Sequence, residues 1–394
     1  MFAGCRRYRR HTAPHPVTQR RDKTLFTPGP LTTSATVKAA MLRDLGSRDS
    51  EFIGIVKDIR TRLLACAGVQ MDAGYEVVLL QGSGTYGVEA VITTAVPRQG
   101  KLLVMVNGAY GARIVKMAQV HGIDHRAETL AEDRAFSAND VVRWLAADKL
   151  ITHVAVVHSE TTTGLMNPIE EIGAATAQQG RSLIVDAMSS FGGVEIDLEA
   201  VHADWLVSSS NKCIEGVPGF AFVIAKNSAL VAAEGQARTL SLDVVAQWRG
   251  LEQSGQFRFT PPTHAILAFH QALLELEQEG GVKGRAARYL DNNRVLREGM
   301  QRLGFHVYLP ASVQGHIITS FHYPDDRAFR FDDFYARLSQ RGHVIYPGKL
   351  TQAACFRVGN IGRIGRPEIE ALLAAAKAVL ADMGVKLAPV GVDR

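Results

Sequence analysis

The sequence predicts an α/β fold with a large domain built on a mostly parallel sheet and a smaller α+β domain at the carboxyl-terminal end. Short apolar runs alternate with helical patterns up to about residue 225, and such alternation is typical of strands joined by crossover helices. The alternation breaks at Pro261 and Pro262, and from Ala286 a predicted helix is followed by strands and helices of a smaller α+β domain. With 394 residues, of which 46% are hydrophobic, the chain is long enough to bury a large core.

Each element is predicted from its own local pattern of apolar spacing. In the large domain, strands are expected at 77–81, 101–106, 154–157, 183–185, 205–207 and 219–225, and helices at 34–42, 52–65, 86–95, 168–178 and 264–279, with one more helix ending near 120. In the small domain, strands are expected at 306–309, 317–322, 344–346 and 355–358, and helices at 286–303, 331–341 and 367–383.

The net charge of +5 is concentrated in the first 23 residues, which carry six arginines and one lysine against Asp22 alone. We predict that residues 1–23 form a disordered basic extension, with an organelle-targeting peptide as the alternative. Residues 24–270 are expected to form an N-terminal arm and the large domain, and residues 271–394 the small domain. The chain beyond the extension has no basic cluster suited to nucleic acid.

Apolar runs and cysteines limit the class of protein further. No apolar run approaches the roughly 20 residues of a membrane span. The four cysteines have no C-x-x-C spacing, which favours neither a zinc site nor a disulfide framework. We therefore expect a cytoplasmic protein with no metal, no membrane partner and no nucleic-acid partner.

Two neighbouring apolar runs are each followed by a polar residue, Asp186 after 183–185 and Lys212 shortly after 205–207. Open α/β sheets place ligands at the carboxyl ends of their strands. A lysine buried there needs a partner or a covalent role, and a Schiff base with an aldehyde cofactor is one such role. Pyridoxal phosphate requires such a lysine together with an acid on its ring nitrogen. The alternative is an ordinary buried pair of Asp186 and Lys212.

The segment Ser83-Gly84-Thr85 lies between a predicted strand and a predicted helix. Backbone N–H groups at a helix start, with two hydroxyls and a glycine that allows close approach, suit an anionic phosphate. A strand-to-helix turn also uses glycine and serine for geometry and capping alone, so that interpretation stays open.

Three further residues occupy positions suited to ligand contact. Tyr110 follows the strand at 101–106 and could stack on a flat cofactor ring, or it could pack at the rim. Thr161 follows the strand at 154–157 and supplies a hydroxyl. Arg357 lies among apolar neighbours of the last strand, where it should find an anion, either a protein carboxylate or a substrate.

Seven segments together resemble, in order along the chain, the class V, fold-type I pyridoxal phosphate aminotransferases, and among them the group that acts on 2-aminoethylphosphonate and pyruvate. They are residues 25–31, 81–90, 107–111, 158–164, 186–193, 209–222 and 356–362. The similarity extends from about Leu25 to Met383. The Arg-rich first 23 residues lie outside the family pattern.

This resemblance implies a role for each matching residue. Cofactor contacts are implied for Ser83, Gly84, Thr85, Tyr110, Thr161, Asp186, Lys212 and Thr260. Lys212 would be the imine lysine and the general acid–base, and Asp186 the partner of the pyridine nitrogen. Thr260 would reach the phosphate from the other subunit, which implies a homodimer with shared active sites. Arg357 would hold the substrate anion.

The implied activity is a ping-pong transamination in phosphonate degradation, which converts 2-aminoethylphosphonate and pyruvate to phosphonoacetaldehyde and L-alanine. An alanine–glyoxylate or serine-type aminotransferase of the same class is the first alternative. A cysteine desulfurase would need a nucleophilic cysteine on a mobile loop, whereas Cys355 lies within a predicted strand. A non-catalytic binding protein is disfavoured because Lys212 and Asp186 are both present.

Overall fold

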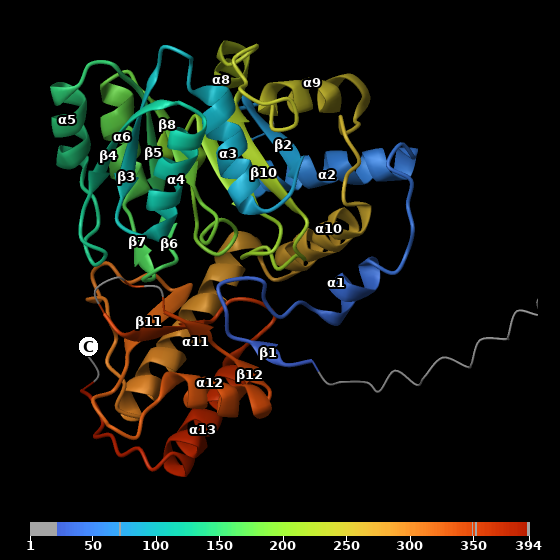
Figure 1. Cartoon of the computed structure of the whole chain (residues 1–394). Helices are drawn as coiled ribbons and strands as arrows, with labels where there is room; N and C mark the ends of the chain where they lie inside the picture. Colours follow the sequence, from blue (N-terminus) through green and yellow to red (C-terminus); the bar gives the residue numbers. More distant parts are fainter. Residues whose placement is uncertain (1–21, 71, 349, 351–352, 392–394) are drawn as a thin grey trace, which may run out of the picture.

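A seven-stranded sheet with helices on both faces forms the larger part of the molecule, drawn in the upper half of Figure 1. The structure is a computed structural model and describes residues 22–70, 72–348, 350 and 353–391. The predicted disordered extension 1–23 therefore lies outside the described residues, except for Asp22 and Lys23.

The strands of this sheet are mostly parallel, as predicted. In spatial order they are β2 (Tyr75–Gln81), β10 (Phe220–Lys226), β9 (Trp205–Ser209), β8 (Ser182–Asp186), β5 (Ile151–Val157), β3 (Lys101–Val106) and β4 (Asp124–Thr129). Only β10 runs antiparallel to its neighbours, and every other pair in this sheet is parallel. The carboxyl ends of β2, β3, β4, β5, β8 and β9 consequently lie along the same edge.

Ten helices of the described chain accompany this sheet. They are α1 (Ala35–Ala40), α2 (Ser50–Cys66), α3 (Gly84–Ala95), α4 (Ala109–Val120), α5 (Ala138–Ala147), α6 (Ile169–Gln178), α7 (Leu198–Val201), α8 (Asn227–Ala232), α9 (Val244–Ser254) and α10 (Thr263–Gln278).

Helices α3 and α6 cover opposite faces of the sheet. A Cβ placed on Gly87 of α3 would lie 3.0 Å from Val207, whereas one placed on Gly173 of α6 would lie 3.2 Å from Leu183. Asp186 is paired in register with Val207, and successive residues of a strand point to opposite faces. The side chain of Asp186 is therefore on the α3 face, while Leu183 is on the α6 face.

A second, three-stranded antiparallel sheet lies below the first in Figure 1. Its strands are β11 (Ile318–His322), β14 (Cys355–Gly359) and β13 (Tyr346–Pro347), and its helices are α11 (Gly281–Arg302), α12 (Phe331–Gln340) and α13 (Arg366–Asp382). Two short pairs complete the fold: β1 (Thr24–Leu25) beside β12 (His343–Val344), and β6 (Ser159–Glu160) beside β7 (Leu165–Met166). Within the described ranges, no helix combines the length and apolarity needed to cross a membrane.

Two large apolar cores and a smaller third cluster lie among the described residues, and the division of the chain at residue 270 stays a prediction. The first core contains buried residues between Val37 and Leu276, and the second contains residues between Val295 and Val385. Phe26, from the N-terminal arm, belongs to the second core. The chain therefore passes from the second core to the first between Phe26 and Val37.

Some elements differ from the sequence-based expectation. Helices α5, α7, α8 and α9 and strands β1, β4, β6 and β7 were not predicted. Residues 306–309 form only an isolated bridge between Val307 and Phe321 instead of a strand. Strand β4 has no buried residue, because it lies at the sheet edge. An edge strand can be polar, so its sequence lacks the apolar run that indicates a buried strand.

We predict opposite effects on stability for alanine at two helical glycines. Gly173→Ala should destabilise the protein by roughly 1–3 kcal/mol, because the added methyl group would clash with the carbonyl oxygen of Val201. Gly54→Ala, at an exposed position of α2 with nothing within 4 Å, should stabilise it by roughly 0.5–1 kcal/mol. Thermal unfolding of both variants measures the difference, and equal melting temperatures would contradict the close packing of α6.

Candidate active site

Residues singled out from the sequence follow five strands that end at one edge of the large sheet. Ser83 to Thr85 follow β2, Tyr110 follows β3, Thr161 follows β5, Asp186 ends β8 and Lys212 follows β9. Four of them, Gly84, Thr85, Tyr110 and Asp186, line one small cavity together with Arg113 and Met188. The structure thus brings these segments, far apart in sequence, to a common site.

Lys212 is half-buried and reaches the N-terminal arm. Its Nζ donates a hydrogen bond to the carbonyl oxygen of Pro28 at 2.7 Å. Gly29 has a φ of +110°, and a Cβ there would lie 2.7 Å from Lys212 Cδ, so a glycine is needed for the arm to pass. Burial lowers the pKa of Lys212 to about 8, because the charged amine loses its hydration.

Asp186 is buried at the end of β8. Its Oδ1 accepts a hydrogen bond from the backbone N–H of Met188 at 2.9 Å. Burial raises the pKa of Asp186 to about 6, since the carboxylate is removed from water. Asp186 and Lys212 each bond to backbone and form no ion pair with one another. They do not form the ordinary ion pair considered as the alternative.

The turn from β2 into α3 has the groups that an anion seat requires. Ser83 is the N-cap residue of α3, is exposed, and makes no side-chain hydrogen bond to its own helix. Its hydroxyl is therefore not used in capping, and the N–H groups of the first turn point to the same place. A negatively charged group is favoured there by the helix dipole as well.

Arg113 adds a positive charge to the cavity, and sequence reasoning did not identify it. Its guanidinium lies 4.8 Å from the ring centre of Tyr110 and donates to Thr85 Oγ1 at 3.3 Å. In the part of the chain that the structure describes, no carboxylate pairs with it. The signal was available, because Arg113 is three residues after Tyr110 and so shares its face of α4.

Arg357 is fully buried in β14, and its donors are directed to backbone carbonyl groups. Nη1 donates to the Thr161 carbonyl at 2.7 Å, and Nη2 donates to the Pro347 carbonyl at 2.8 Å. None of the described carboxylates lies within ion-pair distance. Burial lowers the pKa of Arg357 from its ordinary value, although the group stays charged at neutral pH.

The turn from β6 to β7 connects the two sheets at the site. The carbonyl oxygen of Thr161 accepts the hydrogen bond from Arg357, and the hydroxyl of Thr161 lies 2.6 Å from Ser189 Oγ. Beside it, the buried carboxylate of Glu160 accepts from the hydroxyl and N–H of Thr162 at 2.5 and 3.1 Å. Sequence analysis did not single out Ser189 or Glu160, because neither Ser nor Glu is distinctive in a polar loop.

Thr260 lies outside this cavity. It is exposed on the loop between α9 and α10, where its carbonyl accepts a hydrogen bond from Gln81 Nε2 at 3.2 Å. Gln81 is the last residue of β2, two positions before Ser83. A single chain thus brings Thr260 close to the anion seat but not among the residues that line the cavity.

The arrangement has the groups that pyridoxal phosphate requires. Lys212 has an amine that is partly neutral near neutral pH, Asp186 is a carboxyl group at the sheet edge, and the start of α3 can receive an anion. Tyr110 presents an aromatic ring in the same cavity. The residues present therefore fit the cofactor chemically.

The chain is similar in sequence to proteins of a known family. The family model described as aminotransferase class-V matches residues 32–345. A 2-aminoethylphosphonate–pyruvate transaminase from Salmonella schwarzengrund (strain CVM19633) is 52% identical over 362 residues, covering 91% of this chain and 98% of that protein. The protein of the same name from Salmonella typhimurium is also 52% identical over 362 residues.

Solved structures share the fold. An alanine–glyoxylate aminotransferase from Nostoc sp. superimposes with a TM-score of 0.85 at 26% identity, covering 94% of this chain and 98% of that one. A ureidoglycine–glyoxylate aminotransferase from Bacillus subtilis gives a TM-score of 0.84 at 22% identity, covering 96% of both chains. Family model, relatives and fold together establish that this chain belongs to the class V aminotransferases.

Proposed function

We propose that this chain transfers the amino group of 2-aminoethylphosphonate to pyruvate and so forms phosphonoacetaldehyde and L-alanine. The chain is 52% identical to 2-aminoethylphosphonate–pyruvate transaminases and aligns with 98% of their length, which supports the proposal. The structural observation that carries it is Arg357, a fully buried guanidinium that is paired with no carboxylate among the described residues. An anionic substrate group would complete its environment.

The cofactor of this chain is pyridoxal 5′-phosphate, which the class V family uses. When bound, it supplies a covalent amine acceptor and an electron sink. We propose that Lys212 forms the covalent link and that the start of α3, with Ser83, Gly84 and Thr85, holds the phosphate. Tyr110 would face the ring, and Thr161 would place its hydroxyl near the ring oxygen.

Lys212 is suited to move a proton at the reacting carbon. Its pKa of about 8 leaves a useful fraction of the amine neutral at neutral pH, so that it can act as a base and then as an acid. The carbonyl of Pro28 orients the amine at 2.7 Å. These features support a role for Lys212 in both half-reactions.

Asp186 is suited to hold a proton on a ring nitrogen. Its carboxyl group is buried and directed to the α3 face of the sheet. With a pKa of about 6 it is mainly ionised at neutral pH, and a cationic partner would favour the ionised form further.

A homodimer with shared active sites is part of the same proposal. Thr260 is exposed and lies close to the strand end that precedes Ser83, yet it does not line the cavity of its own chain. Exposed apolar side chains lie nearby in sequence at Phe259 (45% exposed) and Tyr86 (54%). A second subunit that covers this surface would bring its own Thr260 toward the anion seat.

Cysteine chemistry is not supported. Burial raises the pKa of Cys66 and of Cys213 to about 12, and it raises that of Cys355 as well. These thiols stay protonated, whereas a desulfurase needs a reactive thiolate.

The same three cysteines are free and not disulfide-bonded, which supports the proposed cytoplasmic location.

The reaction itself tests the proposal. Purified holoenzyme should form alanine from pyruvate with 2-aminoethylphosphonate as donor, and far more slowly with serine as donor. Alanine with glyoxylate is the matched comparison, because an alanine–glyoxylate aminotransferase shares the fold at a TM-score of 0.85. Faster turnover of alanine and glyoxylate than of the phosphonate and pyruvate would favour that second function instead.

Capture of the cofactor by Lys212 should rise with pH through about 8. The pKa of this lysine is lowered, so the reactive neutral amine is the minor form below pH 8 and the major form above it. Cofactor-free protein mixed with pyridoxal phosphate and treated with borohydride should carry the label on Lys212. The labelling rate should rise with pH in proportion to the neutral fraction of this amine. Lys212→Ala is the control without a label, and a label on another lysine would overturn the assignment.

Arg357→Ala should weaken both half-reactions, because the phosphonate of the donor and the carboxylate of pyruvate are both anions. Loss of a buried charge-assisted contact typically costs about 2–5 kcal/mol, or roughly 30-fold to several thousand-fold in kcat/KM. Arg357→Lys should be poor as well, because an ammonium cannot form the paired contacts of a guanidinium. Exposed Arg363, just after β14, provides the matched control as Arg363→Ala.

The melting temperature of each variant separates binding from folding. Retained stability with loss in both half-reactions supports the anion role of Arg357. A lower melting temperature with unchanged kcat/KM in the folded fraction would show that Arg357 serves only the stability of the second sheet.

A further inference from the structure

Glu215, three residues after Lys212, has an unusual backbone. Its φ is +68°, and among the described residues only His202 is another non-glycine with positive φ. The N–H of Glu215 donates to the carbonyl of Lys212 at 2.7 Å, which closes a tight turn on that lysine. A left-handed conformation is costly for a residue with a Cβ, so something in the structure must hold it.

The side chain of Glu215 provides the restraint. It is 3% exposed, and its Oε1 accepts hydrogen bonds from Tyr289 Oη at 2.6 Å and from Arg288 Nη2 at 2.8 Å. Burial raises the pKa of Tyr289 well above its ordinary value, so its hydroxyl keeps the proton that it donates. Glycine would adopt this turn more easily, but it would lack all of these contacts.

A second contact fixes Cys213, the residue that directly follows Lys212. Arg285 is 1% exposed and donates through Nη1 to the carbonyl of Cys213 at 2.6 Å. Its Nε donates to Glu279 Oε2 at 2.7 Å, and Arg288 Nε donates to the other oxygen of Glu279 at 2.7 Å. Two arginines and two glutamates therefore balance in charge, which a buried network requires.

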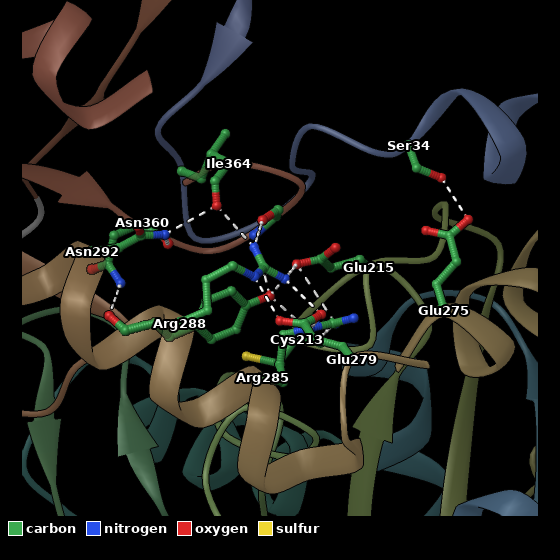
Figure 2. A network of polar contacts seen from close by, with 12 residues as sticks. Ser34, Cys213, Glu215, Glu275, Glu279, Arg285, Arg288, Asn292, Asn360 and Ile364 are labelled. Carbon is green, nitrogen blue, oxygen red and sulfur yellow. Dashed lines mark hydrogen bonds and ion pairs between the residues drawn. The ribbon is translucent and has the colours of Figure 1, made fainter. Parts of the chain in front are cut away.

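The same network reaches the turn after β14. Arg288 Nη1 donates to the carbonyl of Gly362 at 2.6 Å and to that of Ile364 at 2.9 Å. The N–H of Gly362 donates in turn to Tyr289 Oη at 3.2 Å. Figure 2 shows Arg288 of α11 between Glu215 on one side and the turn at Ile364 on the other.

The two ends of this network belong to the two segments that carry the proposed chemistry. One end is the turn that contains Lys212, and the other directly follows the strand that contains Arg357. Lys212 follows a strand of the large sheet and Arg357 belongs to the second sheet, so their relative position is not fixed by the hydrogen bonds of either sheet. A rigid connection between them would fix it.

We propose that Glu215, held by Arg285, Arg288 and Tyr289, is a positioning residue that sets the place of Lys212 relative to Arg357. This inference rests on the proposed function, because it assumes that the two residues act on one substrate. Misplacement of a reacting group by about 1 Å can cost on the order of 100-fold in rate. The network is thus expected to matter for catalysis and not only for stability.

Three variants separate positioning from turn geometry. Glu215→Gly removes the network contacts but relieves the backbone, because glycine accepts a φ of +68°. Glu215→Gln keeps the size and can still accept the hydrogen bonds. Arg294→Ala is the matched control on α11, since Arg294 makes only exposed ion pairs with Asp291 and Glu298.

Two readouts are needed for each variant. The first is the rate at which cofactor-free protein links pyridoxal phosphate to Lys212, fixed by borohydride and measured by mass spectrometry. The second is kcat and KM of the holoenzyme with 2-aminoethylphosphonate and pyruvate, alongside the melting temperature. We expect Glu215→Gly to lose roughly 10- to 100-fold in both rates, with Glu215→Gln between it and the wild type.

Opposite results would overturn the inference. If Glu215→Gly equals the wild type in both rates, the side chain has no positioning role and only the turn matters. If its melting temperature falls while both rates of the folded protein are unchanged, the network serves stability alone. Should Glu215→Gly fail to fold, Tyr289→Phe carries the same test by removing a single hydroxyl, and unchanged rates there would be equally decisive.

Failure of the proposed function would look different. Wild-type protein that does not turn over 2-aminoethylphosphonate would refute that substrate, whereas the rate of cofactor capture at Lys212 would still report on Glu215.

Discussion

The common edge at which six of the seven strands of the large sheet end is the constraint on which the rest of this structure depends. Parallel strands place their carboxyl ends together, so residues separated by more than a hundred positions become neighbours. Ser83, Tyr110, Thr161, Asp186 and Lys212 each follow or end one of these strands. Because β10 alone is reversed, it contributes no carboxyl end to this edge.

Burial at this edge then sets the chemistry. The same loss of water lowers the pKa of Lys212 to about 8 and raises that of Asp186 to about 6. Both shifts move the groups toward neutral pH, where an amine can act as a nucleophile or base and a carboxyl group can respond to a cationic partner. Backbone groups, from Pro28 and Met188, orient both side chains without neutralising them.

The site is completed by polar contacts between the two sheets. Arg357 enters from the second sheet and bonds to the Thr161 carbonyl at the edge of the first. In addition, the network of Glu215, Arg285 and Arg288 connects the lysine turn to the turn after β14 (Figure 2). Directional hydrogen bonds to charged groups fix such a position better than apolar packing can.

By itself, the sequence determined the α/β class, most strands and the candidate residues. The spacing of apolar residues and the polar residues that follow predicted strands are both local patterns, which can be read from the sequence directly. It did not indicate the polar edge strand β4, which has no buried residue. The helical spacing of Tyr110 and Arg113 could have pointed to Arg113, but only the structure shows that both line the same cavity. Only the tertiary structure decided that Pro28 contacts Lys212 and that Glu215 joins α11. Those contacts join segments that are far apart in the sequence. Local sequence patterns do not indicate which distant segments come into contact when the chain folds.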